Sequence, residues 1–142
     1  MAAGASEHRG RCFCGAVRFV ATAEPTWSGI CHCDSCRRAT GGILMAAASF
    51  PRGSVRFEGA ERRFYDSSPG VRRGFCGHCG TALSYENLRW PDDVNLNLAN
   101  FEDPARIRPA MQIFTESRLP WLHLDSDLPR YPGEPIPGTE ER

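Results

Sequence analysis

The cysteines constrain the fold of this chain more than any other feature of its sequence. There are seven in 142 residues, and they fall into three clusters: Cys12 and Cys14; Cys31, Cys33 and Cys36; Cys76 and Cys79. The N-terminal residues lack the apolar core of a secretory signal, which indicates a reducing, cytoplasmic location. Dense cysteine in a reducing compartment is more typical of metal binding than of a disulfide framework, so we expect metal-bound thiolates.

The clusters divide most simply into one site of four cysteines and one site of three. A closed tetrahedral zinc site needs four ligands, and the two cysteine pairs supply four with none left over. Gly15 and Gly80 follow the two pairs, and their conformational freedom suits tight turns that aim backbone amides at sulfur. The predicted closed site is Cys12, Cys14, Cys76 and Cys79.

The middle cluster, Cys31, Cys33 and Cys36, is the candidate catalytic site. Three protein ligands with an open fourth position are typical of a catalytic zinc, which can bind water or a substrate thiolate. His32 lies between two of these cysteines, and on an extended segment its side chain faces away from them, so we expect a hydrogen-bonding or core role. His123 is a spare candidate for the fourth ligand. A metal-free redox switch is an alternative for the same thiols.

Short strands separated by Gly, Pro and Asp predict a mainly β fold with very little helix. Apolar and polar residues alternate in these strands, and no long amphipathic helix lies between them, which favours antiparallel sheets. Helical turns are expected at 34–40 and 102–106. A flexible leader (1–8) and a Pro/Gly-rich tail (133–142) are expected at the ends. The strands are expected within residues 14–23, 43–50, 54–59, 62–67, 70–75, 81–86, 93–101 and 111–117.

The charged residues exclude several classes of site. All 17 basic residues are arginine, and 17 acidic residues bring the formal net charge to zero. Without lysine, the chain cannot form a Schiff base or a lysine-containing phosphate loop. A neutral chain gives no support to a nucleic-acid partner, and no apolar run approaches the roughly 20 residues that span a membrane. Arginines that could offset thiolate charge lie beside each cluster in sequence: Arg11 and Arg18, Arg37 and Arg38, Arg72 and Arg73.

Four motifs together resemble one known family. They are GRCFCGAVRF, CHCDSCRRATGG, GFCGHCGTAL and LNLANFEDPARIRPAMQIFTESRLPWL, in that order. This combination is similar to the glutathione-dependent formaldehyde-activating enzymes, and to centromere protein V in the same domain. The resemblance covers residues 9–132. It implies a β-tent fold, built of antiparallel sheets pinned by zinc.

The resemblance also implies a metal content and a reaction. It implies two zinc ions per chain, a structural one on Cys12, Cys14, Cys76 and Cys79 and a second one on Cys31, Cys33 and Cys36. The implied activity is that of a carbon–sulfur lyase, S-(hydroxymethyl)glutathione synthase, which joins glutathione to formaldehyde. The glutathione sulfur would occupy the open position of the second zinc. Glutathione or another small thiol and a small aldehyde are therefore the expected partners.

Residues near the middle cluster are candidates for substrate binding. Arg37 follows the third cysteine directly and suits the carboxylate of a ligand such as glutathione. Thr40 and Gly41 are expected in a tight turn beneath the site, and Trp27 and Phe50 as pocket walls. Gln112 stands where many members of the family carry His. Two functions other than catalysis remain open, a non-catalytic carrier of glutathione or another thiol and a zinc-stabilised interaction domain, and so does the oligomeric state.

Overall fold

The computed structural model describes residues 7–124 and 126–141, and within them the chain forms ten strands, one α-helix and four 3₁₀ helices. The strands are β1 (His8–Arg11), β2 (Val17–Ala21), β3 (Trp27–Cys31), β4 (Met45–Pro51), β5 (Val55–Gly59), β6 (Arg62–Ser68), β7 (Val71–Cys76), β8 (Ala82–Asn87), β9 (Asp93–Asn97) and β10 (Gln112–Ile113). The helices are α1 (Asp34–Thr40), η1 (Arg52–Ser54), η2 (Leu98–Asn100), η3 (Pro104–Arg106) and η4 (Thr115–Ser117).

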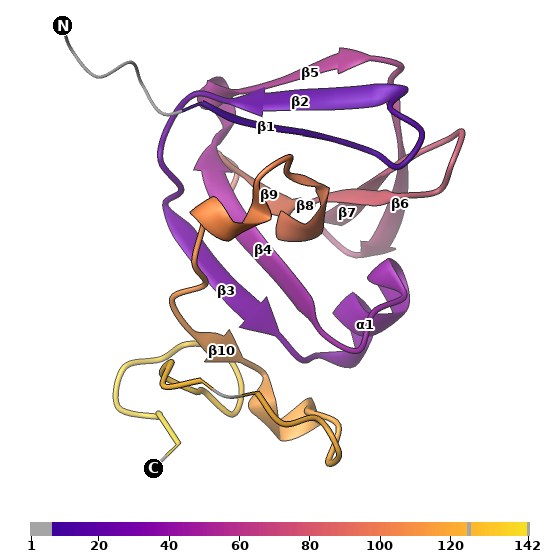
Figure 1. Ribbon diagram of the computed structural model, residues 1–142. Helices are drawn as coiled ribbons and strands as arrows, with labels where there is room; N and C mark the ends of the chain where they lie inside the picture. The colour runs from indigo at the N-terminus through magenta and orange to yellow at the C-terminus, as the bar shows by residue number, and fades with distance from the viewer. Residues whose placement is uncertain (1–6, 125, 142) are drawn as a thin grey trace, which may run out of the picture.

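These strands form two sheets. The smaller sheet has the order β1-β2-β5, and the larger has the order β10-β3-β4-β9-β8-β7-β6. Among the strands of the described residues, every pair is antiparallel except β10 with β3, which is parallel. Figure 1 shows the smaller sheet at one end of the molecule, with α1 and β10 at the other end. The predicted mainly β fold of antiparallel sheets with very little helix is confirmed.

The helix predictions and most of the strand predictions agree with the structure. The segment 34–40 forms α1, and η3 lies within 102–106. Gly41 ends α1 in the left-handed conformation (φ 74°), and its N–H donates to Arg37 O. Strands β1 and β3 were not among the expected strands. Only two residues of the segment 111–117 are strand, because η4 begins at Thr115.

The main hydrophobic core joins the two sheets. Alternation along β9 buries Val94 and Leu96 and leaves Asn95 and Asn97 on the opposite face. Burying one large apolar side chain contributes about 2 kcal/mol to stability. Phe50 belongs to this core, is 0% exposed and packs near the ring of Phe101. The prediction that Phe50 lines a substrate pocket is therefore wrong.

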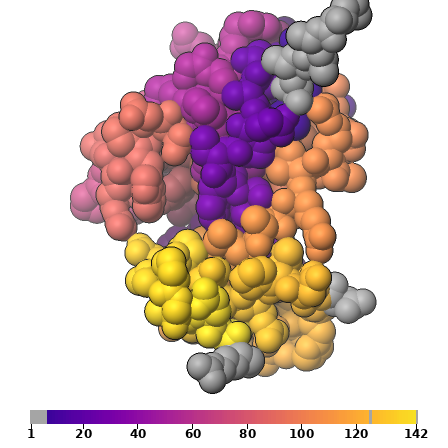
Figure 2. Space-filling model, turned by 90° about the vertical axis from the view of Figure 1, so that its left-hand side faces the viewer, coloured from indigo at the N-terminus to yellow at the C-terminus, as the bar shows by residue number. Residues whose placement is uncertain are grey.

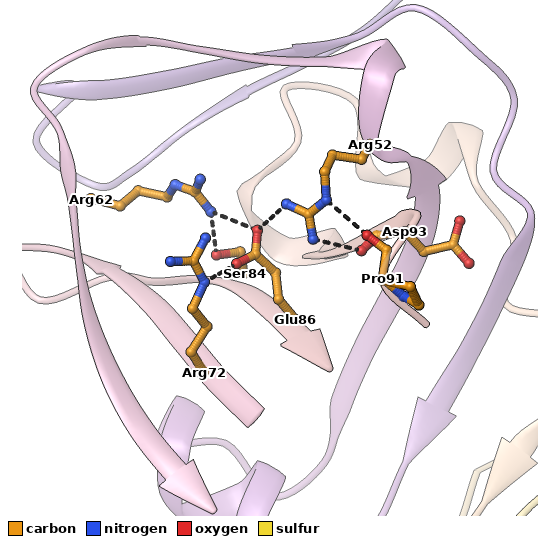
Figure 3. A network of polar contacts seen from close by, with 7 residues as sticks. All are labelled: Arg52, Arg62, Arg72, Ser84, Glu86, Pro91 and Asp93. Atoms are coloured by element: carbon orange, nitrogen blue, oxygen red, sulfur yellow. Dashed lines mark hydrogen bonds and ion pairs between the residues drawn. The ribbon is translucent and has the colours of Figure 1, made fainter. Parts of the chain in front are cut away.

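A buried carboxylate on β8 is surrounded by arginines from three other elements (Figure 3). The side chain of Glu86 is 5% exposed, and Arg52, Arg62 and Arg72 lie within ion-pair distance of it. Arg62 also donates to Ser84 Oγ at 2.8 Å. Burial raises the pKa of Glu86, but hydrogen bonds from Arg72 and Arg52 outweigh it and bring the pKa below its usual value. The network therefore ties η1, β6 and β7 to β8 through one anion.

Both ends of the described chain pack against the domain. His8 lies in β1 and is 5% exposed, although it falls within the expected leader; residues 1–6 lie outside the described residues. The C-terminal segment lies beside β10 in Figure 1, and in Figure 2 its yellow atoms cover the lower end of the molecule. Its backbone forms two hydrogen bonds with Gln112 of β10: Gln112 N–H donates to Pro129 O, and Tyr131 N–H donates to Gln112 O. Of the expected tail, residues 133–141 are described.

No helix among the described residues has the length and apolar character needed to cross a bilayer.

Candidate metal centres and the adjoining pocket

Two turns bring the four-cysteine cluster together. Cys12 and Cys14 lie in the turn between β1 and β2, and Cys76 and Cys79 lie at the end of β7 and in the turn that follows it. The four Sγ atoms lie within 4.8 Å of one another. Two of the separations, 3.6 Å and 3.9 Å, are close to the roughly 3.8 Å between sulfurs that share a tetrahedral zinc. The cluster fits a closed zinc site.

Backbone geometry in both turns supports thiolates. Gly15 and Gly80 have φ of 78° and 80°, as the predicted tight turns require. The N–H of Val17 donates to Cys12 Sγ at 3.3 Å, and the N–H of His78 donates to the Sγ of Cys76 at 3.4 Å. Such donors stabilise the negative sulfur that a metal needs.

Thr81 links the two turns. Its hydroxyl accepts from Phe13 N–H at 3.0 Å and lies 3.2 Å from Cys79 Sγ. This hydroxyl, with backbone donors at Cys14 and Thr81, lowers the pKa of Cys79 to about 5. The thiolate form of Cys79 is therefore present at neutral pH.

The three-cysteine cluster lies where β3 ends and α1 begins. Cys31 is the last residue of β3, Cys33 is the N-cap of α1, and Cys36 lies in the first turn of α1. Their Sγ atoms lie within 4.8 Å of one another, and Cys36 N–H donates to Cys33 Sγ at 3.3 Å. Hydrogen bonds from Cys31 and Cys36 lower the pKa of Cys33, whereas the contacts of Cys31 with Cys33 and Cys36 raise the pKa of Cys31. A cation bound at the cluster would favour the thiolate form of all three cysteines.

The described chain supplies three ligands to this cluster and no fourth. No further Cys, His, Asp or Glu among the described residues has a ligand atom within 4.8 Å of all three sulfurs. His32 is 0% exposed, and its Nε2 lies 2.8 Å from Gln112 Oε1, so the expected hydrogen-bonding or core role is confirmed. His123 is exposed and lies outside the cluster. The arrangement fits a metal site with an open position.

Arg72 and Arg73 lie close to Cys76 in the sequence, but in the structure their side chains have other partners. Arg73 precedes Cys76 by three residues, but its Nη1 lies 3.9 Å from the Sγ of Cys36, in the three-cysteine cluster. Arg72 instead pairs with Glu86. The two side chains point to opposite faces of the sheet because neighbouring residues alternate along a strand. Arg73 therefore offsets the charge of the other cysteine site.

A cavity of about 160 Å³ adjoins the three-cysteine cluster. It lies between α1 and one face of the larger sheet, and its lining includes Thr40, Met45, Tyr65, Arg73, Tyr85 and Asn97.

Met45 also packs with Cys31 and Cys36 in a small apolar cluster, which Ile113 and Phe114 complete. Phe114 has φ of 53°, a conformation that costs energy for a residue other than glycine and that is common at functional sites. Within this apolar cluster, Cys31 and Cys36 are buried and Cys33 is partly exposed.

The comparisons with known proteins decide the family. Residues 7–117 match the model of the glutathione-dependent formaldehyde-activating enzyme family. A curated relative from Halomonas elongata, "Putative glutathione-dependent formaldehyde-activating enzyme", is 33% identical over 128 residues, covering 82% of this chain and 80% of the relative.

The chain belongs to the glutathione-dependent formaldehyde-activating enzyme family.

Other relatives of this formaldehyde-activating family member agree in class and in fold. A Schizosaccharomyces pombe protein described as an uncharacterized lyase is 34% identical over 91 residues, covering 63% of this chain and 66% of the relative. A Rhodobacter sphaeroides protein of known crystal structure has 24% identity and a TM-score of 0.57, covering 71% of this chain and 91% of that one. The last similarity concerns the fold alone. The names of the curated relatives support a lyase-type enzyme.

Arg37, the expected carboxylate-binding residue of this family member, is engaged within the protein. Its guanidinium donates to the backbone oxygens of His32 and Ser117 and forms an ion pair with Asp34. The side chain is 19% exposed. Arg37 thus holds the cysteine loop against the η4 segment, and its binding of a substrate carboxylate stays a prediction.

Of the other expected substrate residues, Thr40 lines the cavity, whereas Gly41 and Trp27 do not. The hydroxyl of Thr40 donates to Cys36 O at 2.8 Å. Gly41 is the exposed C-cap of α1. Trp27 lies over Gly29, where a Cβ would be 2.5 Å from the indole ring, and Trp27 is not part of the cavity lining. The residues that sequence reasoning missed are Tyr65, Tyr85 and Asn97, which carry no local signal because strand pairing alone brings them together.

Proposed function

We propose that this protein is a zinc-dependent carbon–sulfur lyase that joins glutathione or another small thiol to formaldehyde or a related aldehyde. The observation that carries the proposal is the three-cysteine cluster, which has no fourth ligand from the described chain and lies beside a cavity. A three-ligand zinc site is typical of catalysis, whereas a four-ligand site is typical of structure. Membership of the formaldehyde-activating family supplies the reaction class.

The cysteines determine what the site can hold. Cys31, Cys33 and Cys36 would hold the second zinc, and Cys12, Cys14, Cys76 and Cys79 would hold the structural zinc, two ions per chain. A zinc with an open position supplies a Lewis acid that keeps a bound thiol deprotonated at neutral pH. The seven cysteines are all free thiols in the structure. Such a protein works in a reducing compartment, and we infer the cytoplasm.

The protein surroundings favour a thiolate as the attacking group. Arg73 places a positive charge beside Cys36, and the apolar side chains of Met45 and Phe114 pack against the cluster, in which Cys31 and Cys36 are buried. In the reaction a sulfur–carbon bond forms as the substrate thiolate attacks the aldehyde carbon. The π electrons of the carbonyl move to its oxygen, which takes a proton from water. No oxidant or reductant is consumed.

The experiment that tests this proposal measures how fast the adduct forms. Exchange NMR with formaldehyde and glutathione follows the S-hydroxymethyl adduct with and without enzyme. We expect the zinc-loaded protein to accelerate exchange and Cys33→Ser to lose that acceleration. Ser35→Ala, an exposed change on the same helix, is the matched control and should keep it. Thiol binding without acceleration would indicate a carrier and would contradict the proposal.

A further inference from the structure

One row of cross-strand partners runs over the larger sheet to the three-cysteine site. The row consists of Tyr65, Arg73, Tyr85, Asn95 and Ser49, each paired with the next. Residues directly opposite one another project from the same face of a sheet. Ser49 and Met45 share that face because they are four positions apart on β4, and Met45 pairs with Cys31. Arg73 and Cys31 therefore project from one face.

Arg73 is held over this face by its neighbours. Its Nε donates to Ser67 Oγ at 3.1 Å, and its Cζ lies 5.0 Å from the centroid of the Tyr85 ring. Its Nη1 is 3.9 Å from Cys36 Sγ. These contacts fix a guanidinium at the wall of the cavity, next to the cysteines.

Arg73 differs from the other arginines around the core of this sheet. Arg52, Arg62 and Arg72 all share the carboxylate of Glu86. Among the described residues, no acidic side chain lies within 4.0 Å of the Arg73 guanidinium. Ser67 and a sulfur leave most of its five N–H donors unused, in the planar arrangement that matches a carboxylate. The cavity wall thus carries a guanidinium that lies beside the Cys36 sulfur and has no carboxylate partner among the described residues.

The size of the cavity limits the ligand. Its volume of about 160 Å³ is roughly half the lower limit of about 300 Å³ for pockets that enclose drug-sized ligands. A thiol as large as glutathione would therefore extend out of the cavity for most of its length. A compact thiol could place both its sulfur and a nearby carboxylate inside.

We propose that Arg73 is the specificity-determining residue of this site and that the site takes an anionic low-molecular-weight thiol, whose carboxylate Arg73 binds while its sulfur faces the three cysteines. This inference rests on the proposed function, because it assigns the substrate class of the same site. It gives the row of side chains on β6, β7 and β8 a role in recognition, whereas the cysteines on β3 and α1 supply the reactive end.

The test compares two thiols of the same shape, 3-mercaptopropionate and 3-mercaptopropionamide. Binding is followed in cobalt-loaded protein, in which a thiolate that joins the metal changes the sulfur-to-cobalt absorption, so the readout does not depend on turnover. The unmodified protein should bind the carboxylate at least about tenfold more tightly than the amide, as expected for a charge-assisted hydrogen bond. Arg73→Ala should abolish this preference and leave the affinity for the amide within about twofold.

Two further variants control for effects on the metal. Arg38→Ala removes a positive charge from α1 outside the cavity lining, where the side chain is 81% exposed, and should change neither affinity. Arg73→Lys keeps a charge near Cys36 but loses the planar pair of donors, so it should lose part of the preference and retain its cobalt.

The outcomes separate the two proposals. Equal affinities for the two thiols in the unmodified protein, or equal losses for both in Arg73→Ala and Arg73→Lys, would overturn the role of Arg73. Adduct formation with equal affinities would leave the proposed lyase function intact and contradict only the assignment of the anionic substrate. A preference for the carboxylate without adduct formation would support the role of Arg73 and contradict the lyase function.

Discussion

Cys33 has two local roles that a substitution can separate. Its sulfur belongs to the three-cysteine cluster, and it also accepts the N–H of Cys36 as the N-cap of α1. Serine is a favourable N-cap residue but a poor zinc ligand. Helix formation and metal binding at this residue therefore depend on different properties of the side chain.

We predict that Cys33→Ser remains folded and binds one zinc instead of two. The serine hydroxyl preserves the cap, so the melting temperature should change little, whereas the metal loses a ligand. Cys79→Ser should instead lose the structural zinc and unfold, because binding at such a site contributes on the order of 10 kcal/mol to folding. Elemental analysis and thermal unfolding of both variants check this. Two zinc ions in Cys33→Ser, or a folded Cys79→Ser, would contradict the assignment.

A second prediction at the scale of residues concerns Glu86 and the stability of the fold at low pH. Its folded-state pKa lies below the usual value of about 4.3, so the unfolded chain binds its proton more readily. The stabilisation is complete above pH about 4.3 and is lost as the pH falls through the lowered folded-state pKa. Glu86→Gln should cost about 3 kcal/mol at neutral pH, because it leaves buried arginine charge unpaired.

The pH dependence of that difference is measured by urea unfolding. The free energies of unfolding of the two proteins should converge as the pH falls from the ordinary glutamate range through the lowered folded-state pKa, because below that pKa Glu86 is protonated in both states. Glu58→Gln, on the smaller sheet and 37% exposed in its side chain, is the matched control and should show a small difference. A difference for Glu86→Gln that stays constant down to pH about 3 would refute this account of the network.

At the scale of elements, the short strand β10 depends on the C-terminal segment. The N–H groups of Gln112, Phe114 and Thr115 donate to backbone oxygens at Pro129, Gly133 and Tyr131. The same segment seats Phe114 in its left-handed conformation beside the cysteines. The family match ends at residue 117, so this support comes from outside the matched region.

Truncation after Asp127 should loosen β10 without unfolding the domain. It removes several backbone hydrogen bonds of about 1 kcal/mol each, so the free energy of unfolding should fall by about 2–4 kcal/mol. Hydrogen exchange should become faster at residues 112–115, while amides of β2 and β5 serve as the internal control. Unchanged exchange at 112–115 would show that β10 is held by β3 alone.

Local pattern was sufficient to predict some of these elements and insufficient for others. Alternation identified β2, β4 and β9, and the short segment around Cys36 indicated α1, because both signals lie within a few residues. The pairing of β10 with β3 and with Arg130 joins residues far apart in the chain. Arg73 shows the same limit. Strand alternation predicts that its side chain lies on the opposite face from Arg72, but its neighbours on that face depend on the order of the seven strands, which local pattern does not give.

At the scale of the whole molecule, the two cysteine sites occupy different parts of one framework. The four-cysteine cluster joins the turn between β1 and β2 to the turn after β7, and so connects the smaller sheet to the larger one. The three-cysteine cluster lies at the end of the molecule that carries α1 and β10 (Figure 1). One site is positioned to maintain the fold, and the other lies beside a cavity whose lining residues Arg73, Thr40 and Met45 contact its cysteines.

The most direct test of this division is the sulfur coordination of zinc in protein purified under anaerobic conditions. X-ray absorption should give about 3.5 sulfur atoms per zinc in the free protein, the mean of a closed and an open site. Addition of a saturating thiol such as 3-mercaptopropionate should raise the value to about 4. A value of about 4 before thiol is added, or no change after it, would contradict an open position at Cys31, Cys33 and Cys36.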